Sequence, residues 1–262
     1  MRNFGQKEFN SGERIYAPYE ESRRDERGIK EHLDRYNFAL KFLTGKETVI
    51  DAACGSGYGS EILSSGAKKV IGLEISNHAI EYAKRYHFKE NVEFCKADLN
   101  QKIDLPDNYS DVIISFETLE HITNQENMLL EFKRLLKPGG FLIISTPDKN
   151  LISGGFESDN PFHIKELTKI EFINLLRRFF VIEEMFGQTR LTELPLWKRC
   201  LKRFRNISFL RKAKQRLAKG LGFEKVLHRH FAAEEYVPIQ TIDIESPNQF
   251  YVLIALCRNA KL

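Results

Sequence analysis

The sequence predicts an α/β fold in which a largely parallel sheet carries helices on both faces. Apolar runs of strand length alternate with segments whose apolar residues recur at helical spacing, as βαβ units require. With 262 residues, 42% of them hydrophobic, the chain is long enough for one domain with a full core. These patterns predict strands near 47–52, 69–74, 91–97, 110–116, 140–146, 179–186 and 249–258, and helices near 58–65, 77–87, 124–137 and 169–178.

Local sequence marks several boundaries of these elements. A helix over about 29–42 leads into the first strand. The sequences Thr-Asn-Gln-Glu at 123–126 and Thr-Lys-Ile-Glu at 168–171 both fit a capping box, in which the threonine and glutamate side chains satisfy the first amides of a helix. The Lys-Pro-Gly-Gly sequence at 137–140 is expected to end one helix and start the next strand.

The region 187–247 interrupts the alternation of strands and helices. It separates the last two strands by about 60 residues, whereas such connections usually have 2–6. Its apolar residues interleave with Lys and Arg, a mixture that predicts amphipathic helices. The expected organisation is a helical lead-in over 1–45, a ligand-binding core over 46–188, a basic helical insertion over 189–247 and a final core strand over 248–262.

Composition argues against a membrane-spanning or secreted protein. The longest apolar run, 250–257, is far shorter than the roughly 20 residues that a spanning helix needs. The N-terminal residues are polar and lack the apolar stretch of a signal peptide. Three of the four cysteines lie in expected core segments, and no Cys-x-x-Cys pair is present. The expected location is therefore the cytoplasm.

The net charge of +4 is unevenly distributed. Between Arg190 and Arg229, thirteen Lys or Arg residues stand against Glu193 and Glu224, a local charge of +11 that leaves −7 on the remaining chain. The basic segment 198–230 fits a solvated helical face. It also fits peripheral contact with the anionic inner face of a membrane, at about 1 kcal/mol per basic residue. Nucleic acid is a less favoured partner, because no base-reading module is recognised.

A glycine-rich loop that follows an acidic residue is the most informative local feature. Asp51 ends the first apolar run, and Gly55, Gly57 and Gly59 follow at every second position. A loop without side chains lets backbone amides contact a ligand at the start of a helix. The negative charge of Asp51 favours a cationic ligand group over a pyrophosphate.

Further polar signals follow the next three strands. In an open α/β sheet, ligands bind outside the carboxyl ends of the strands. Glu74 ends the second strand about 20 residues after the loop, where a carboxylate can bind two ribose hydroxyls. Asp98 follows the third strand and could accept the amino group of an adenine, and the fourth strand delivers Ser115 and Phe116. A dinucleotide-binding loop fits less well, because Ser60 stands at the sixth position of its fingerprint, where glycine or alanine is usual, and Asp51 precedes the loop where an apolar residue is preferred.

These motifs resemble the S-adenosylmethionine (SAM) site of class I methyltransferases over about 14–188. Bacterial methyltransferases associated with polysaccharide and glycan assembly are similar, with related sequences at 31–36, 53–60, 115–121, 160–166 and 186–188. The resemblance implies SAM as methyl donor and a Rossmann-like seven-stranded sheet whose last strand is antiparallel. The residues expected to bind SAM are Asp51, Ala53, Gly55, Gly57, Tyr58, Glu74, Ile75, Asp98, Leu99, Ser115 and Phe116.

The sequence Glu-Thr-Leu-Glu-His at 117–121 directly follows the fourth strand. Methyl transfer is an in-line displacement, so positioning supplies much of the rate, but a hydroxyl acceptor must also lose a proton. One helical turn would bring the ionisable groups of this sequence to one side. His121 could act as a general base oriented by Glu117 or Glu120. Alternatively these three residues and His163 could bind a metal, or Glu120 and His121 could merely satisfy backbone groups ahead of the next helix.

The metal alternative rests on a further resemblance. Ubiquinone-pathway O-methyltransferases and small-RNA 2′-O-methyltransferases hold a metal with the same Glu-x-x-Glu-His spacing, and in the latter a later histidine, comparable to His163, completes the set. Two carboxylates and two imidazoles suit Mn²⁺, Fe²⁺ or Zn²⁺ better than Mg²⁺. The expected function is SAM-dependent methyl transfer to a hydroxyl of a sugar, glycan or other small molecule. O-methylation of a quinone-like phenol or an RNA ribose and a non-catalytic SAM-binding module are alternatives.

Overall fold

The computed structural model describes residues 26–156, 160–189, 239–245 and 250–260. Its helices are α1 (Glu26–Ala39), α2 (Tyr58–Ser64), α3 (Asn77–Tyr86), α4 (Gln125–Leu135), α5 (Lys149–Ile152) and α6 (Lys169–Arg177), with 3-10 turns η1 (Leu40–Phe42) and η2 (Leu119–His121). Its strands are β1 (Thr48–Ala52), β2 (Lys69–Glu74), β3 (Val92–Lys96), β4 (Ser110–Ser115), β5 (Leu136–Pro147), β6 (Val181–Gln188), β7 (Ile239–Thr241) and β8 (Val252–Arg258).

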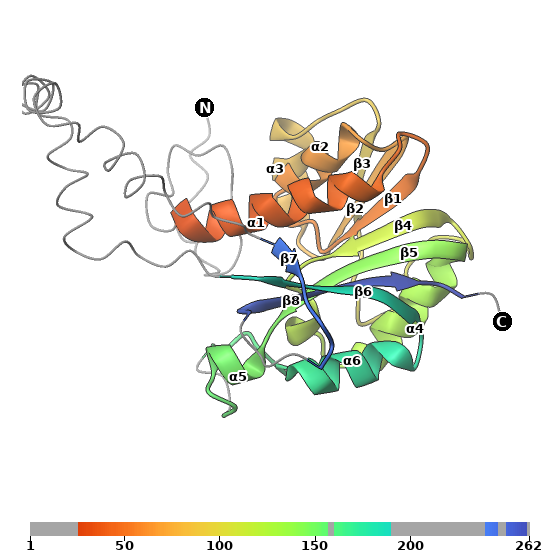
Figure 1. The fold of residues 1–262 in the computed structure, drawn as a ribbon. Helices are drawn as coiled ribbons and strands as arrows, with labels where there is room; N and C mark the ends of the chain where they lie inside the picture. The colour runs from red at the N-terminus through yellow and green to blue at the C-terminus, as the bar shows by residue number, and fades with distance from the viewer. Residues whose placement is uncertain (1–25, 157–159, 190–238, 246–249, 261–262) are drawn as a thin grey trace, which may run out of the picture. The chain divides into compact units, whose positions relative to one another are not determined.

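The strands form one mixed sheet in the order β3-β2-β1-β4-β5-β8-β6-β7 (Figure 1). Neighbours from β3 to β5 are parallel, whereas β8 lies antiparallel between β5 and β6. The α/β class, the seven predicted strands and the antiparallel last strand are confirmed. None of the described helices is long and apolar enough to cross a lipid bilayer.

The sheet also contains one strand that the sequence did not predict. An eighth strand, β7, pairs antiparallel with residues 186–188 at the edge of the sheet. Three residues are too few for a strand alternation to stand out in a sequence, and they fall inside the predicted insertion 189–247. The predicted basic helices of 198–230 lie outside the described residues.

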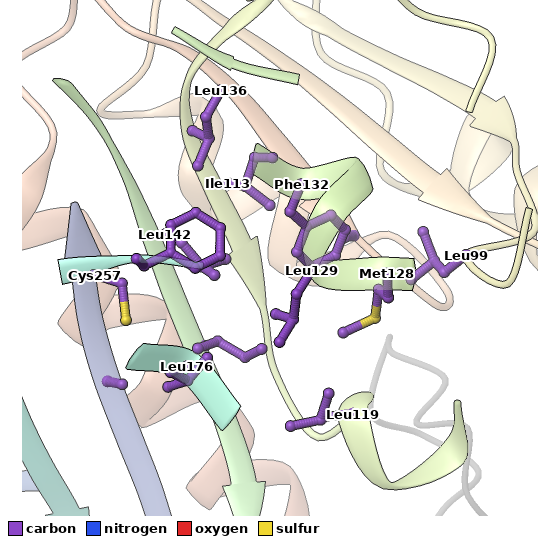
Figure 2. Packing of buried hydrophobic residues seen from close by; sticks show 14 of the residues in the cluster. Leu99, Ile113, Leu119, Met128, Leu129, Phe132, Leu136, Leu142, Leu176 and Cys257 are labelled. Carbon is purple, nitrogen blue, oxygen red and sulfur yellow. The ribbon is translucent and has the colours of Figure 1, made fainter. Parts of the chain in front are cut away.

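Apolar clusters cover both faces of the sheet, because successive residues of a strand point to opposite sides. One cluster joins the sheet to α4 and α6, and the other joins it to α1 and α2 (Figure 1). Figure 2 shows the first cluster, in which Met128, Leu129 and Phe132 of α4 pack against strand residues such as Ile113 and Leu142. This alternation also decides where the polar residues of the central strands point.

Helix starts show one confirmed and one wrong prediction. The capping box of Thr168 and Glu171 is present at the start of α6. At α4, however, Asn124 is the N-cap and its side chain accepts from the Asn127 amide, so the predicted box at 123–126 is absent. The carboxylate of Glu126 instead pairs with Arg178, and asparagine caps a helix at least as well as threonine.

Gly59 provides a test of the packing between α1 and α2. A Cβ added at Gly59 would lie 2.0 Å from Cζ of Tyr36, whose ring is held edge-on by Tyr58 and Phe116. Gly59→Ala is therefore expected to lower the free energy of unfolding by about 1–3 kcal/mol. At an open helical position the same change would raise it by up to about 1 kcal/mol. Denaturant midpoints measure the difference, and a raised midpoint would contradict this packing.

Candidate functional site

The carboxyl ends of β1 and β4 carry unusual backbone conformations. Ala53 and Glu117 follow these neighbouring strands, and both have positive φ, at 61° and 49°. A residue with a Cβ rarely adopts this region, which costs about 1–3 kcal/mol and is concentrated at functional sites. The two strained residues therefore mark this edge of the sheet as the candidate site, as the sequence predicts.

The glycine loop after β1 combines close packing with open space. Gly57 has φ +93°, and a Cβ there would lie 2.6 Å from the Cβ of Ala83, so only glycine lets α3 pack this closely. A Cβ at Gly55, by contrast, would meet nothing within 4 Å. The Gly55 amide donates to Glu74 Oε2 at 3.2 Å, and the Ser76 amide donates to Oε1 at 2.9 Å. The loop and the acidic end of β2 thus meet beside open space.

Asp51 lies buried on the α1 face of the sheet. The Tyr36 hydroxyl donates to its Oδ1 at 3.1 Å, and the Ser60 hydroxyl donates to its Oδ2 at 2.6 Å. Burial raises the pKa of Asp51 from 3.8 to about 6, although both hydrogen bonds oppose the shift. Sequence reasoning did not assign Tyr36 or Ser60 to the site. A buried acid needs donors, and a serine one turn into the following helix was the available signal.

The predicted adenine end of the site is more open. Asp98 Oδ1 accepts from the Asn100 amide at 2.9 Å, which fixes the turn after β3. Leu99 is buried in the cluster with α4 (Figure 2), so its side chain belongs to the core. Ile75 is 51% exposed beside Glu74 and forms an apolar rim. The structure therefore brings all four predicted strand ends to one edge, but it gives Leu99 a packing role.

The end of β4 carries one buried group that lacks a partner. Ser115 is fully buried, and its Oγ has no hydrogen-bond partner among the described residues. Phe116 packs edge-on against Tyr36, with ring centroids 5.2 Å apart, and Tyr36 packs in the same way against Tyr58. An aromatic wall thus extends from the glycine loop to the residues that follow β4.

Beyond β4, a carboxylate and two imidazoles converge. Ligand atoms of Glu120, His121 and His163 all lie within 4.8 Å of one another. Glu120 is 1% exposed, and the Thr146 hydroxyl donates to its Oε2 at 3.1 Å. The Glu120 carbonyl accepts from the amides of Ile164 and Lys165, which holds the chain around His163 against η2. The sequence predicted that His121 and His163, which are 42 positions apart, would lie in the same cluster.

Both imidazoles are oriented through Nδ1. His121 Nδ1 lies 2.9 Å from the Phe162 carbonyl, which can only accept, so Nδ1 carries a proton and, in the neutral ring, Nε2 carries the lone pair. His163 Nδ1 lies 2.5 Å from Oε1 of Glu166, and the Ser153 hydroxyl contacts the other oxygen of that carboxylate. Metal-ligating histidines almost always make such a contact through the second ring nitrogen. The arrangement therefore fits a divalent cation.

Glu117 departs from the predicted four-ligand set, because it is not in the group that lies within 4.8 Å. The Ser145 hydroxyl donates to Glu117 Oε1 at 2.7 Å and accepts from its amide at 3.1 Å. Burial, and next the negative charge of Glu117, raise the pKa of Glu120 well above its ordinary value. Ser145 was not predicted for the site, although polar residues at the end of a buried strand could have signalled it.

Comparison with known proteins places the chain in a family. A family model described as "Methyltransferase domain" matches residues 43–192, and the chain belongs to this methyltransferase family. A probable S-adenosylmethionine-dependent methyltransferase of Mycolicibacterium smegmatis is 33% identical over 141 residues, 53% of this chain and 54% of the relative. The ubiquinone biosynthesis O-methyltransferase of Nitrosomonas europaea is 29% identical over 120 residues, 44% of this chain and 51% of the relative.

The chain spans about half the length of the curated relatives that it matches. Membership in the family makes SAM the cofactor, and the open glycine loop beside Glu74 fits that ligand. Among solved structures, YcgJ from Bacillus subtilis has a TM-score of 0.55 at 14% identity, covering 88% of this chain and 100% of that chain. The [4+2]-cyclase SpnF has a TM-score of 0.56 at 16% identity, covering 88% and 81%. Because a cyclase shares the fold, the chemistry must be argued from the site.

Proposed function

We propose that this chain transfers the methyl group of SAM to a hydroxyl of a sugar, glycan or other small molecule, aided by a divalent cation. The observation that carries the proposal is the cluster of Glu120, His121 and His163, with both imidazoles oriented through Nδ1. A buried carboxylate beside two such imidazoles is a ligand set for Mn²⁺, Fe²⁺ or Zn²⁺ more than for Mg²⁺. Such a cation would lower the pKa of an acceptor hydroxyl.

The residues at the strand ends would position the two substrates. Bound SAM supplies an electrophilic methyl group on a positively charged sulfur. The Gly55 backbone and Glu74 would hold its nucleoside, and Asp51 would place a negative charge near its cationic end. Glu120, His121 and His163 would hold the acceptor oxygen beside the methyl group, because reacting atoms must approach to about 3–3.5 Å.

Two other functions are distinguished by specific observations. The ubiquinone biosynthesis relative makes a quinone-like phenol the second candidate acceptor. If no cation binds, His121 can act as a general base with Nε2, because its Nδ1 proton is held by a carbonyl. A non-catalytic SAM-binding module does not account for the convergence of the three ligand groups. Membrane contact through 198–230 and a cytoplasmic location stay predictions.

A product assay tests the proposal. The chain would be incubated with isotopically labelled SAM and a panel of nucleotide sugars, lipid-linked glycans, catechols and RNA, with and without a strong chelator. We expect an O-methylated product, identified by its methyl chemical shift, and loss of turnover after chelation that added Mn²⁺ restores. Methylation at nitrogen or carbon would contradict the hydroxyl acceptor. Full turnover in the presence of chelator would contradict the role of the cation and favour His121 as the general base.

A further inference from the structure

The cluster of Glu120, His121 and His163 is built from two separate segments of the chain. The first two residues belong to η2, which has only three residues, and His163 lies in the segment 160–166, which contains no helix or strand. Regular hydrogen bonds within a helix or strand therefore cannot hold the three side chains at their separations. Because a binding or catalytic group must be held to within about 0.5 Å, contacts between the two segments have to fix the cluster.

The side chain of Gln125 bridges the two segments. Gln125 is the first residue of α4 and is 5% exposed. Its Nε2 donates to the Leu119 carbonyl of η2 and to the Lys165 carbonyl, both at 2.9 Å. Both partners are carbonyl oxygens that can only accept, so the side-chain atom between them must be the amide nitrogen. One amide group thus uses its two protons to join the two halves of the cluster.

Helix capping does not account for this side chain. Asn124 is the N-cap of α4, and its side chain accepts from the Asn127 amide. The Leu119 carbonyl already accepts from the Ile122 amide at 3.2 Å, so it does not depend on the glutamine for a donor. Oε1 of Gln125 is buried and has no hydrogen-bond partner among the described residues. Because a buried acceptor without a partner is unfavourable, the two donated bonds explain the glutamine, and its oxygen does not.

The other hydrogen bonds between the two segments lie close to this bridge. The Glu120 carbonyl accepts from the Ile164 amide at 2.8 Å, and His121 Nδ1 lies 2.9 Å from the Phe162 carbonyl. Glu120 and Ile164 are each next in sequence to a residue whose carbonyl accepts from Gln125. Loss of the bridge would therefore loosen these bonds together and release the Nδ1 proton of His121 from its carbonyl.

We propose that Gln125 is a positioning residue whose amide fixes the distance between η2 and the segment 160–166 and so pre-organises Glu120, His121 and His163. Gln125 acts through the backbone carbonyls of the two segments. The inference rests on the proposed function, because that function gives the cluster its role. The bridge itself is independent of what the cluster binds, so it can be measured in the metal-free chain.

Nuclear magnetic resonance on the metal-free full chain, labelled with ¹⁵N in histidine and glutamine side chains, tests the bridge. Gln125→Met keeps the length of the side chain but cannot donate, and Gln240→Met, at an exposed glutamine of β7, is the matched control. At pH 8 we expect slow hydrogen exchange of the Gln125 side-chain amide and a proton on Nδ1 of His121 in the wild type. In Gln125→Met the His121 nitrogen shifts should move towards those of free imidazole, whereas in Gln240→Met they should not change.

A titration of Mn²⁺ into the same proteins measures the consequence for the cluster. We expect Gln125→Met to bind Mn²⁺ about 10–100-fold more weakly, the range for losing a group that orients metal ligands. Its affinity for S-adenosylhomocysteine, measured by calorimetry, should change less than about twofold. A residue that only stabilised the fold would lower the thermal midpoint and leave both the His121 tautomer and the Mn²⁺ affinity as they are.

The outcomes separate this inference from the proposed function. Fast exchange of the Gln125 side-chain amide in the wild type overturns the inference, as does an unchanged His121 tautomer or an unchanged Mn²⁺ affinity in Gln125→Met. Wild-type protein that binds no cation contradicts the proposed metal centre, and the His121 tautomer in Gln125→Met then decides the inference by itself. If Gln125→Met does not fold, amide exchange in the wild type decides it.

Discussion

Glu120→Gln is expected to lower kcat for methyl transfer by about 10²–10⁴-fold, the range for losing a group that assists proton removal. Glutamine keeps the shape of the side chain but supplies no negative charge to a cation or to His121. Because Glu120 is not among the residues proposed to bind SAM, affinity for S-adenosylhomocysteine should change less than about twofold, well under 1.4 kcal/mol. Steady-state kinetics and calorimetry on the same preparation measure both quantities.

The stability of Glu120→Gln provides the control for this variant. Burial raises the pKa of Glu120, which favours the protonated, uncharged acid in the metal-free chain. The amide resembles that acid, so the thermal midpoint of the metal-free protein should stay within a few degrees of the wild type, equivalent to less than about 1 kcal/mol. Glu93→Gln, at an exposed residue of β3, should leave activity unchanged and cost at most about 1 kcal/mol, because it removes only an exposed ion pair with Lys69. Retention of wild-type kcat in Glu120→Gln would contradict the proposed role.

Asp51→Asn is expected to stabilise the empty protein while weakening its affinity for SAM. The unfolded chain releases the Asp51 proton near pH 3.8, whereas the folded chain holds it to about pH 6. Between these values the folded state binds more protons, so its stability falls as pH rises through the window, by up to about 3 kcal/mol. Asparagine carries no charge, so at pH 8 the variant should gain about 1–3 kcal/mol of unfolding free energy.

The same substitution removes a negative charge beside the proposed cationic end of SAM. A loss of about tenfold in affinity, or 1.4 kcal/mol, is the expected minimum. Denaturant unfolding at pH 4, 6 and 8 and calorimetry with SAM measure the two opposite effects. Asp104→Asn, at an exposed aspartate, should change neither the free energy of unfolding nor the affinity for SAM. If Asp51→Asn lowered stability at pH 8 without weakening SAM, the carboxylate would be structural.

Most of the fold follows from the sequence because buried parallel strands read as continuous apolar runs. Val70, Ile71 and Leu73 of β2 are all buried, and such runs located seven of the eight strands. β7 was missed because its three residues show no local strand pattern and form a strand only by pairing with β6, which is distant in the sequence. The capping box at 123–126 failed for a similar reason, since Arg178 lies 52 residues from the Glu126 that it pairs with.

The candidate site was predictable where function requires a fixed local spacing. The glycine loop, Glu74 and the Glu-x-x-Glu-His sequence each lie at a strand end, so topology alone brings them to one edge. The residues that support them were not predictable in this way. Tyr36, Thr146 and Glu166 reach the site from α1, β5 and the segment before α6, and only the packing of these elements reveals the contacts.

The proposed metal centre is tested most directly by titrating Mn²⁺ into the chelator-treated chain with S-adenosylhomocysteine present and measuring bound metal by electron paramagnetic resonance. We expect one Mn²⁺ per chain in the wild type and a loss of affinity of at least tenfold, about 1.4 kcal/mol, in His163→Ala. The proposed metal centre would be contradicted by wild-type protein that binds no Mn²⁺, Fe²⁺ or Zn²⁺ at this cluster, or by a His163→Ala variant that binds Mn²⁺ equally well.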